Sequence, residues 1–278
     1  MKNILIPTDF SPNAWNALKY ALGFFKGVHC NFYLLHVAPL SEYPVMGHSF
    51  TPSLGETGMP SKNKLDAFTE RAKNKAESKL HHFFPELHYG LLIDVTRRLV
   101  KEKKIDLIVM GTKGASGIKR LIIGSNTGDI ITKVQCNTLV VPEHVVYGRP
   151  RMITFPTDYN IFYSHAILET LSELVIANKA HLKVLHVVGS NENLSEDQQN
   201  NRAYLQDYLE EIFPKQHGFH LIDNRKITQG IQEFISEKQS DLTIMVAKNL
   251  NFLQQLLFDS TVEKVSFHTQ VPFLVIHG

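Results

Sequence analysis

Apolar and polar positions along the chain alternate between short, continuously apolar runs and longer stretches in which apolar side chains recur at helical spacing. Continuous apolar runs are typical of parallel strands covered on both faces, and the helical recurrence is typical of amphipathic helices. In the first half, we expect strands at Asn3–Pro7, Asn31–Val37, Leu87–Leu91, Asp106–Gly111 and Thr138–Val141. The helices expected between them are Pro12–Phe25 with Ser11 as its N-cap, Leu65–Phe84, Asp94–Lys103 and Thr127–Val134. Strands that alternate with helices predict a doubly wound α/β domain with a five-stranded parallel sheet.

The same pattern occurs twice along the chain. The matching pairs are Ile6–Phe10 with Phe155–Tyr159, Leu35–Val37 with Leu185–Val187, Phe84–Pro85 with Phe213–Pro214, Asp106–Met110 with Asp241–Met245, and Leu139–Val141 with Leu274–Ile276. A length of 278 residues is ample for two such units. We therefore expect two repeated domains, residues 1–146 and 151–278, joined by the short segment Tyr147–Pro150.

The difference in residue number between matching positions of the two copies changes most in the segment that follows the second strand. The first copy has additional residues there, at Ser41–Lys62, which are rich in Pro and Gly and show no helical or alternating period. Long loops of this kind are either functional or disordered. A lid and a disordered surface excursion both remain open as interpretations.

The amino-acid composition and net charge limit the class of protein but do not indicate a function. Hydrophobic residues make up 43% and charged residues 20%, which is ordinary for a globular protein, and the net charge is +2 without a basic block. These values argue against a nucleic-acid or membrane-surface partner. The chain also lacks a long apolar run and a signal-peptide pattern, so we expect a cytoplasmic protein with Cys30 and Cys136 as buried, reduced thiols.

The residues that follow the fourth strand carry the clearest candidate chemistry. Gly111, Gly114, Gly124 and Ser125 form the pattern Gly-x2-Gly-x9-Gly-Ser. In parallel sheets, ligands bind beyond the carboxyl ends of the strands, glycines permit a close approach of the backbone, and a helix N-terminus favours negative charge. The spacing therefore favours a phosphate site, and a glycine-rich turn without a ligand is the alternative.

In these features, the sequence resembles the universal stress protein family in its tandem, two-domain form. The resemblance rests on Pro7–Asp9, His36–Val37, Asp106–Gly111, the full glycine pattern and Cys136–Val141. It implies a Rossmann-like fold of the adenine nucleotide alpha hydrolase type with strand order 3-2-1-4-5, and ATP binding by members that keep the glycine pattern.

The resemblance also assigns roles to individual residues. Asp9 would contact the adenosine end of the nucleotide, and Val37 would line the adenine pocket. The ribose and phosphates would lie on Gly111, Gly114, Gly124, Ser125 and Asn126, and Pro7, Thr8 and Met110 complete the predicted set. Asn126 is a mild departure from the family pattern, but its backbone N–H should still serve. The expected cofactor is ATP, with or without Mg²⁺.

The second copy departs further from the glycine pattern. Val246, Asn249 and Asp259 replace the three glycines, and only Ser260 keeps its counterpart. A carboxylate about 4 Å from a phosphate charge costs about 4 kcal/mol at an effective dielectric near 20. We expect a degenerate triphosphate site there, although Lys248 and the retained pair Thr157–Asp158 leave room for a neutral, adenosine-like ligand.

Other polar residues give weaker signals. His81–His88 contains several histidines, but on a helix they lack the usual zinc spacing, and we interpret them as surface residues. His36 and His186 are expected to make structural hydrogen bonds beside the site. The P-loop pattern and a locally marked catalytic triad are absent from the sequence. We therefore expect an ATP-binding stress-response regulatory protein. A slow ATP hydrolase and a scaffold that no longer binds nucleotide are the alternatives.

Each copy ends in an apolar strand that the element order places at an edge of its sheet, Thr138–Val141 and Phe273–Ile276. An exposed apolar edge favours aggregation unless it is paired or covered. In the resembled family, similar domains associate through this strand. We expect the two copies to pair within one chain as a pseudo-dimer, with any homodimer using another surface.

Overall fold

The computed structural model describes residues 1–40, 60–112, 124–188, 193–224, 226–248 and 270–278. The first half contains β1 (Lys2–Pro7), α1 (Pro12–Phe24), β2 (Cys30–Ala38), α2 (Pro60–Lys75), β3 (His81–Tyr89), α3 (Leu92–Glu102), β4 (Leu107–Gly111), α4 (Ser125–Lys133) and β5 (Thr138–Val141). The second half contains β6 (Met152–Pro156), α5 (His165–Asn178), β7 (His181–Val188), α6 (Glu196–Ile212), β8 (His217–Asp223), α7 (Ile227–Glu237), β9 (Leu242–Val246) and β10 (Phe273–Ile276).

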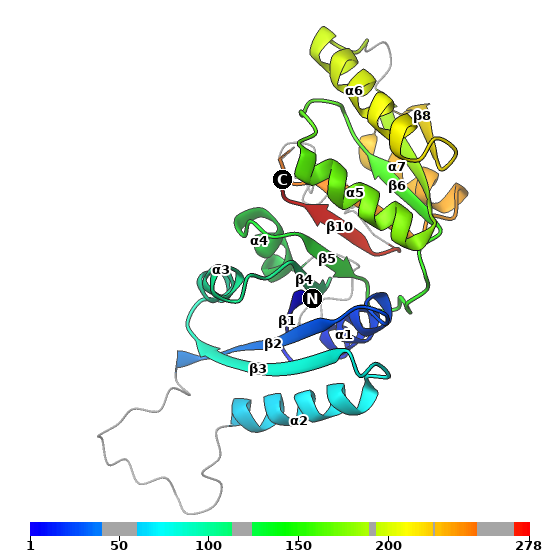
Figure 1. Cartoon of the computed structure of the whole chain (residues 1–278). Helices are drawn as coiled ribbons and strands as arrows, with labels where there is room; N and C mark the ends of the chain where they lie inside the picture. The colour runs from blue at the N-terminus through cyan, green and yellow to red at the C-terminus, as the bar shows by residue number, and fades with distance from the viewer. Residues whose placement is uncertain (41–59, 113–123, 189–192, 225, 249–269) are drawn as a thin grey trace, which may run out of the picture.

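Within each half the strands are parallel, and the two halves share one sheet. The described strands form a ten-stranded sheet in the order β3-β2-β1-β4-β5-β10-β9-β6-β7-β8. The first half thus has the order 3-2-1-4-5, and the second half repeats it in reverse. The predicted doubly wound α/β fold with two repeated units is confirmed, and Figure 1 shows the two halves one above the other.

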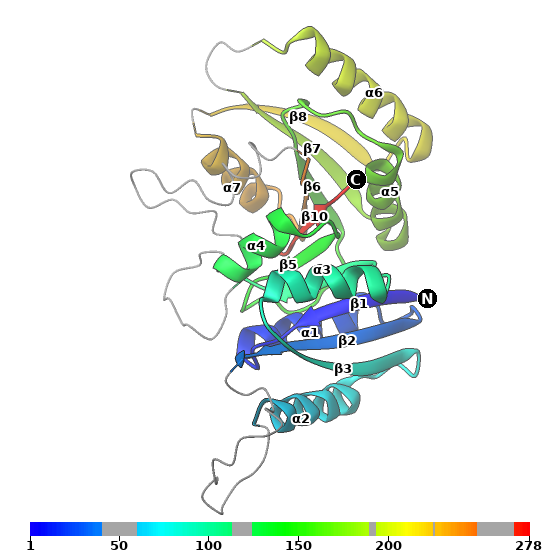
Figure 2. The same cartoon turned by 90° about the vertical axis from the view of Figure 1, so that its left-hand side faces the viewer.

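Helices cover both faces of the sheet (Figure 2) and bury two apolar layers. One layer contains side chains of α1, α2, α5 and α6, and the other contains side chains of α3, α4 and α7. Successive residues of β1 show the division: Ile4 and Ile6 belong to the first layer and Leu5 to the second. This is why the strands are continuously apolar, because both of their faces are buried.

The halves meet at their last strands. β10 pairs antiparallel with β5, with Phe273 opposite Val140, Leu274 opposite Leu139 and Val275 opposite Thr138. Every residue of both strands is buried. Beside this pair, Asn137 Oδ1 accepts a hydrogen bond of 2.8 Å from the His277 N–H. The apolar edges of the two sheets therefore cover each other.

The start of α1 follows the sequence prediction. Ser11 is the N-cap, its Oγ accepts a hydrogen bond of 3.2 Å from the Ala14 N–H, and Pro12 is the first helical residue. Proline suits that position because its missing N–H would have no partner inside the helix. This cap sets the direction in which the chain leaves β1.

The prediction for residues 65–91 was partly wrong. α2 ends at Lys75, and residues expected to continue the helix form β3, which pairs with β2 from Cys30–His81 to Ala38–Tyr89. Leu80 and Phe83 extend the apolar helical period by coincidence, and Pro85 is tolerated because β3 is an edge strand. The histidines of this segment therefore lie on a strand rather than on a helix. His81 Nε2, for example, donates a hydrogen bond of 2.9 Å to the Phe25 carbonyl.

Both cysteines are free and buried. Burial raises the pKa of the Cys30 thiol to about 11 and that of Cys136 to about 12, so both remain protonated at neutral pH. Across the described helices, none is long and apolar enough to cross a bilayer.

Candidate functional site

A cavity of about 210 Å³ lies at the carboxyl ends of β1, β2 and β4, which we call the first-half cavity. The break in strand order between β2-β1 and β4-β5 is where open parallel sheets bind ligands. The lining residues are Pro7, Thr8, Asp9, Ala14, Leu35, His36, Val37, Gly90, Leu92, Met110, Gly111, Asn126 and Thr127.

The loop after β1 is held by its own side chains. Thr8 Oγ1 accepts a hydrogen bond of 3.0 Å from the Phe10 N–H, and Asp9 Oδ1 accepts one of 3.0 Å from the Ser11 N–H. Phe10 adopts a positive φ of 65°, which is uncommon for an aromatic residue and is stabilised here by these bonds. The loop is thereby fixed, with Asp9 exposed at the rim of the first-half cavity.

His36 fastens this loop to β2. Its Nδ1 lies 2.8 Å from the Thr8 carbonyl oxygen, which can only accept, so Nδ1 carries the proton. The Phe10 ring packs on the imidazole with centroids 4.3 Å apart. In the second half, His186 Nδ1 donates to the Thr157 carbonyl at 2.8 Å, and the Tyr159 ring lies 5.0 Å away. Both histidines make the structural hydrogen bonds expected from the sequence.

Gly111 at the end of β4 lies close against α1 in the cavity wall. A Cβ atom at this position would lie 2.6 to 2.7 Å from the carboxamide of Asn13 on α1, closer than atoms can approach. The Gly111 carbonyl accepts a hydrogen bond of 2.9 Å from Thr127 Oγ1, which ties β4 to α4. Packing therefore favours glycine at this position, whether or not the cavity holds a ligand.

The N-terminus of α4 faces the same region. Gly124 is its N-cap and has no side chain to cap the helix, and its N–H donates a hydrogen bond of 2.7 Å to the Thr112 carbonyl. The first backbone N–H groups of a helix have no acceptor within it, and together with the helix dipole they favour an anion. Ser125 and Asn126 follow on the exposed side of this turn.

The structure brings most of the predicted site residues together. Seven line the first-half cavity: Pro7, Thr8, Asp9, Val37, Met110, Gly111 and Asn126. Gly124 and Ser125 immediately precede Asn126 at the start of α4, and Gly114 lies outside the described residues. The predicted loop at 41–62 also falls outside them, except for its last residues, which begin α2.

Sequence reasoning missed several lining residues. Ala14, Leu35, Gly90, Leu92 and Thr127 carry no motif of their own. Gly90 has a φ of 120°, a conformation that favours glycine, and its position between a strand and a helix was the only available signal.

The equivalent region of the second half is packed differently. Val187, the counterpart of Val37, lies against Gly230 of α7 together with Ile222 and Asn224, each within 3.1 to 3.2 Å of where a Gly230 Cβ would be. Both carboxylate oxygens of Asp158 accept hydrogen bonds from Asn160, at 3.0 and 2.9 Å. The substituted positions Asn249 and Asp259, and the retained Ser260, lie outside the described residues.

Comparison with known proteins agrees with this arrangement of two units. The family model described as "Universal stress protein family" matches residues 1–142 and again residues 151–277. Two universal stress proteins of Methanocaldococcus jannaschii are 28% and 29% identical over 151 and 156 residues. Each match covers 50% of this chain and 81% and 94% of the relatives.

A solved structure extends the similarity of fold to the full length. The crystal structure of a universal stress protein from Archaeoglobus fulgidus has a TM-score of 0.68 and 18% identity, and the match covers 99% of this chain and 95% of that one. At this identity, the likeness supports the fold alone.

Proposed function

The chain belongs to the universal stress protein family, with two copies of its domain in tandem, and from this premise we propose that its first half binds an adenine nucleotide. The proposed ligand is ATP, with or without Mg²⁺, and the proposed role is stress-response regulation in the cytoplasm. The observation that carries the proposal is the first-half cavity, in which seven of the residues predicted from the sequence lie together at the switch point of the sheet.

The apolar wall of the cavity suits the base and the sugar. Leu35 and Val37 of β2 and Met110 of β4 contribute apolar surface near the carboxyl ends of their strands. Asp9 at the rim would accept hydrogen bonds from the adenosine end, and its loop is held in place by Thr8 and His36. A fixed acceptor costs little entropy when the ligand binds.

The other end of the cavity suits the phosphates. The uncapped N-terminus of α4 supplies backbone N–H groups at Ser125 and Asn126, and Gly111 adds no side chain above the strand end. Gly114 is proposed as a further phosphate-binding residue because of its place in the Gly-x2-Gly-x9-Gly-Ser pattern. Because glycine at 124 leaves the helix end open, a side-chain carboxylate there would repel a phosphate.

We propose binding rather than turnover. In the described part of the cavity lining, the side chains that could serve as a general base are Asp9 and His36. Asp9 Oδ1 accepts from the Ser11 N–H and His36 Nδ1 donates to the Thr8 carbonyl, and these bonds fix where the two side chains lie. Both lie at the end proposed for adenosine, away from the end proposed for the terminal phosphate.

We propose that the second half does not bind ATP and serves as the structural partner of the first. Asn160 engages both oxygens of Asp158, the counterpart of Asp9. Val246 also replaces the glycine that packs against α1 in the first half. The antiparallel pairing of β10 with β5 supports the role of structural partner.

The identity of the ligand is tested by denaturing freshly purified protein and identifying the released small molecules by mass spectrometry. We expect an adenine nucleotide from the wild type, little from Gly124→Asp, and wild-type amounts from Gly148→Asp. Gly148 is a matched control because a Cβ there would have nothing within 4 Å. Release of a different ligand class, or equal loss from both variants, would contradict the proposal.

A further inference from the structure

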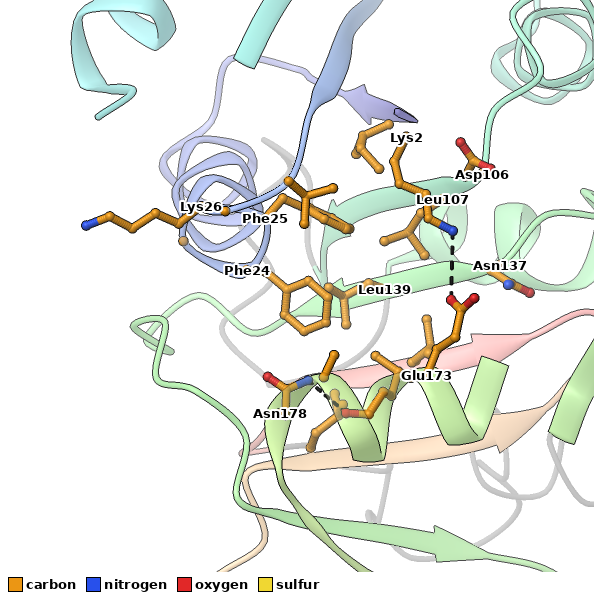
Figure 3. Close-up of a pocket in the computed structure, with 18 of the residues that line it drawn as sticks. Lys2, Phe24, Phe25, Lys26, Asp106, Leu107, Asn137, Leu139, Glu173 and Asn178 are labelled. Atoms are coloured by element: carbon orange, nitrogen blue, oxygen red, sulfur yellow. Dashed lines mark hydrogen bonds and ion pairs between the residues drawn. The ribbon is translucent and has the colours of Figure 1, made fainter. Parts of the chain in front are cut away.

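A second cavity, of about 420 Å³, lies between the two halves, and we call it the interdomain cavity (Figure 3). It lies at the ends of β1 and β4 opposite to the first-half cavity, beside Lys2, Ile4 and Leu107. One wall is the C-terminal end of α1 at Phe24 and Phe25, and the facing wall is α5. Its volume lies within the range of small-molecule sites, which are frequent at domain interfaces.

The floor of the interdomain cavity is apolar and belongs to both halves. Leu107 and Leu139 come from β4 and β5, and Leu242 and Leu274 come from the corresponding strands of the second half. At one end, the Tyr147 ring packs so closely on Gly23 that a Cβ at Gly23 would collide with it. The floor can therefore bury an apolar body but offers it few polar partners.

Charged groups lie at the mouth of the cavity. Lys2 Nζ points across it to Glu173 Oε2, but the distance is 3.8 Å and both side chains are about half exposed. Such an exposed pair contributes little free energy, so a competing anion can replace one partner. Arg149 also lines the cavity and donates to the Ala177 carbonyl from one nitrogen at 2.7 Å, leaving other guanidinium N–H groups for a ligand.

The other charges of the lining are already engaged. Asp106 Oδ2 accepts a hydrogen bond of 2.7 Å from the Asn3 N–H. Lys26 points away from the cavity and pairs with Glu77 at 2.8 Å (Figure 3). With Asp106 and Lys26 set aside, Lys2 and Arg149 face one carboxylate at the mouth, that of Glu173. Two cations against one carboxylate favour an anionic head group over a cationic one.

We propose that the interdomain cavity binds a small amphipathic monocarboxylate. The apolar body lies on the leucine floor, and the carboxylate accepts from Lys2 in place of Glu173, with Arg149 as a second donor. This site is separate from the first-half cavity and does not depend on the nucleotide proposal.

The proposal is tested by titrating the full chain with sodium octanoate in a calorimeter, with 1-octanol and octylammonium chloride as size-matched neutral and cationic probes. We expect one octanoate per chain, bound at least about threefold more tightly than either control, as an exposed charge pair allows. Ala177→Trp should abolish binding because the indole would fill the cavity. Ala177 itself is exposed, so the fold should tolerate the larger side chain. Ile176→Trp, exposed on the same helix but outside the lining, should leave it unchanged.

A second pair of variants tests the head group. Lys2→Gln should weaken octanoate about three- to fivefold and leave octanol unchanged, whereas Lys26→Gln should alter neither. Equal affinity for octanoate and octanol, tighter binding of octylammonium, or octanoate binding that survives Ala177→Trp would overturn the proposal. If the wild-type chain sediments as a dimer and Ala177→Trp sediments as a monomer, the occupant of the cavity would instead be a second copy of the chain.

Discussion

At the scale of single residues, the close approach of Gly111 to Asn13 shapes the first-half cavity. A Cβ at position 111 would lie 2.6 Å from the buried Asn13 carboxamide, so Gly111→Ala forces the Asn13 side chain, or α1 and β4 themselves, to shift. We expect Gly111→Ala to lower the free energy of unfolding by about 1–3 kcal/mol, which is typical of overpacking, and to weaken nucleotide binding. Urea denaturation and calorimetric titration measure the two effects.

The double variant Gly111→Ala/Asn13→Ala separates this collision from other consequences of the substitution. If the collision is the cause, the double variant should be more stable than the sum of the two single effects predicts. Strictly additive effects would show that the close approach of these two residues is not what requires glycine.

His277 links stability to pH. It lies beside the β5–β10 pair, and burial lowers the pKa of its imidazole below the ordinary value, although a backbone hydrogen bond at Ile131 opposes the shift. Because the unfolded chain then binds more protons, stability is fully present above the ordinary histidine pKa of about 6.5 and is lost as the pH falls below it.

We therefore expect the free energy of unfolding to fall between pH 7.5 and 5.5, with His277 contributing at most about 1.4 kcal/mol per pH unit. His277→Gln should reduce this slope, and the same change at the exposed His144 should not. Urea titrations at several pH values measure the slope of the free energy of unfolding against pH. An unchanged slope in His277→Gln would rule out this residue as the source.

Helix capping provides a test at the scale of single elements, because the two halves differ at equivalent positions. Ser11 caps α1 with a hydrogen bond to the Ala14 N–H, whereas Ser164 at the N-cap of α5 makes no such bond. We expect Ser11→Ala to cost about 1 kcal/mol of stability and Ser164→Ala to cost clearly less. Thermal or urea unfolding of both variants compares them, and equal losses would contradict the assigned role of the cap.

The elements themselves show where sequence reasoning holds. Strands buried on both faces, such as β1, β4 and β5, were predicted within a residue or so because their apolar runs are continuous. Only the last residues of β3 were predicted as a strand, because β3 is an edge strand with mixed polarity and Leu80 and Phe83 extend the helical period of α2. The identity of β3 is decided by pairing with β2, which no local pattern contains.

The candidate site was predictable where a short stretch of sequence carries the signal. Gly111 and Gly124 stand out through their spacing before the last helix of the first half, and Thr8–Asp9 stands out as the turn that follows the first strand. Asn13 and Leu92 were not predictable, since their places at the site depend on how α1 and α3 pack against the sheet. The packing of Val187 against Gly230 in the second half likewise depends on a contact between distant segments.

At the scale of the whole molecule, the pairing of β5 with β10 predicts that the halves depend on each other. A fragment of residues 1–146 would expose the buried edge of β5, whose four residues are Thr138–Val141. We expect this fragment to form a homodimer or to aggregate, as sedimentation analysis would show. A soluble monomer that keeps full affinity for ATP would indicate that the second half is not the structural partner of the first.

The central claim is that one chain holds one adenine nucleotide, in its first half. Isothermal titration of the full chain with ATP tests it most directly, because the stoichiometry separates the two halves without altering either. We expect a stoichiometry near one, with binding lost in Gly124→Asp and retained in Gly148→Asp. A stoichiometry near two, or undiminished binding in Gly124→Asp, would contradict the account.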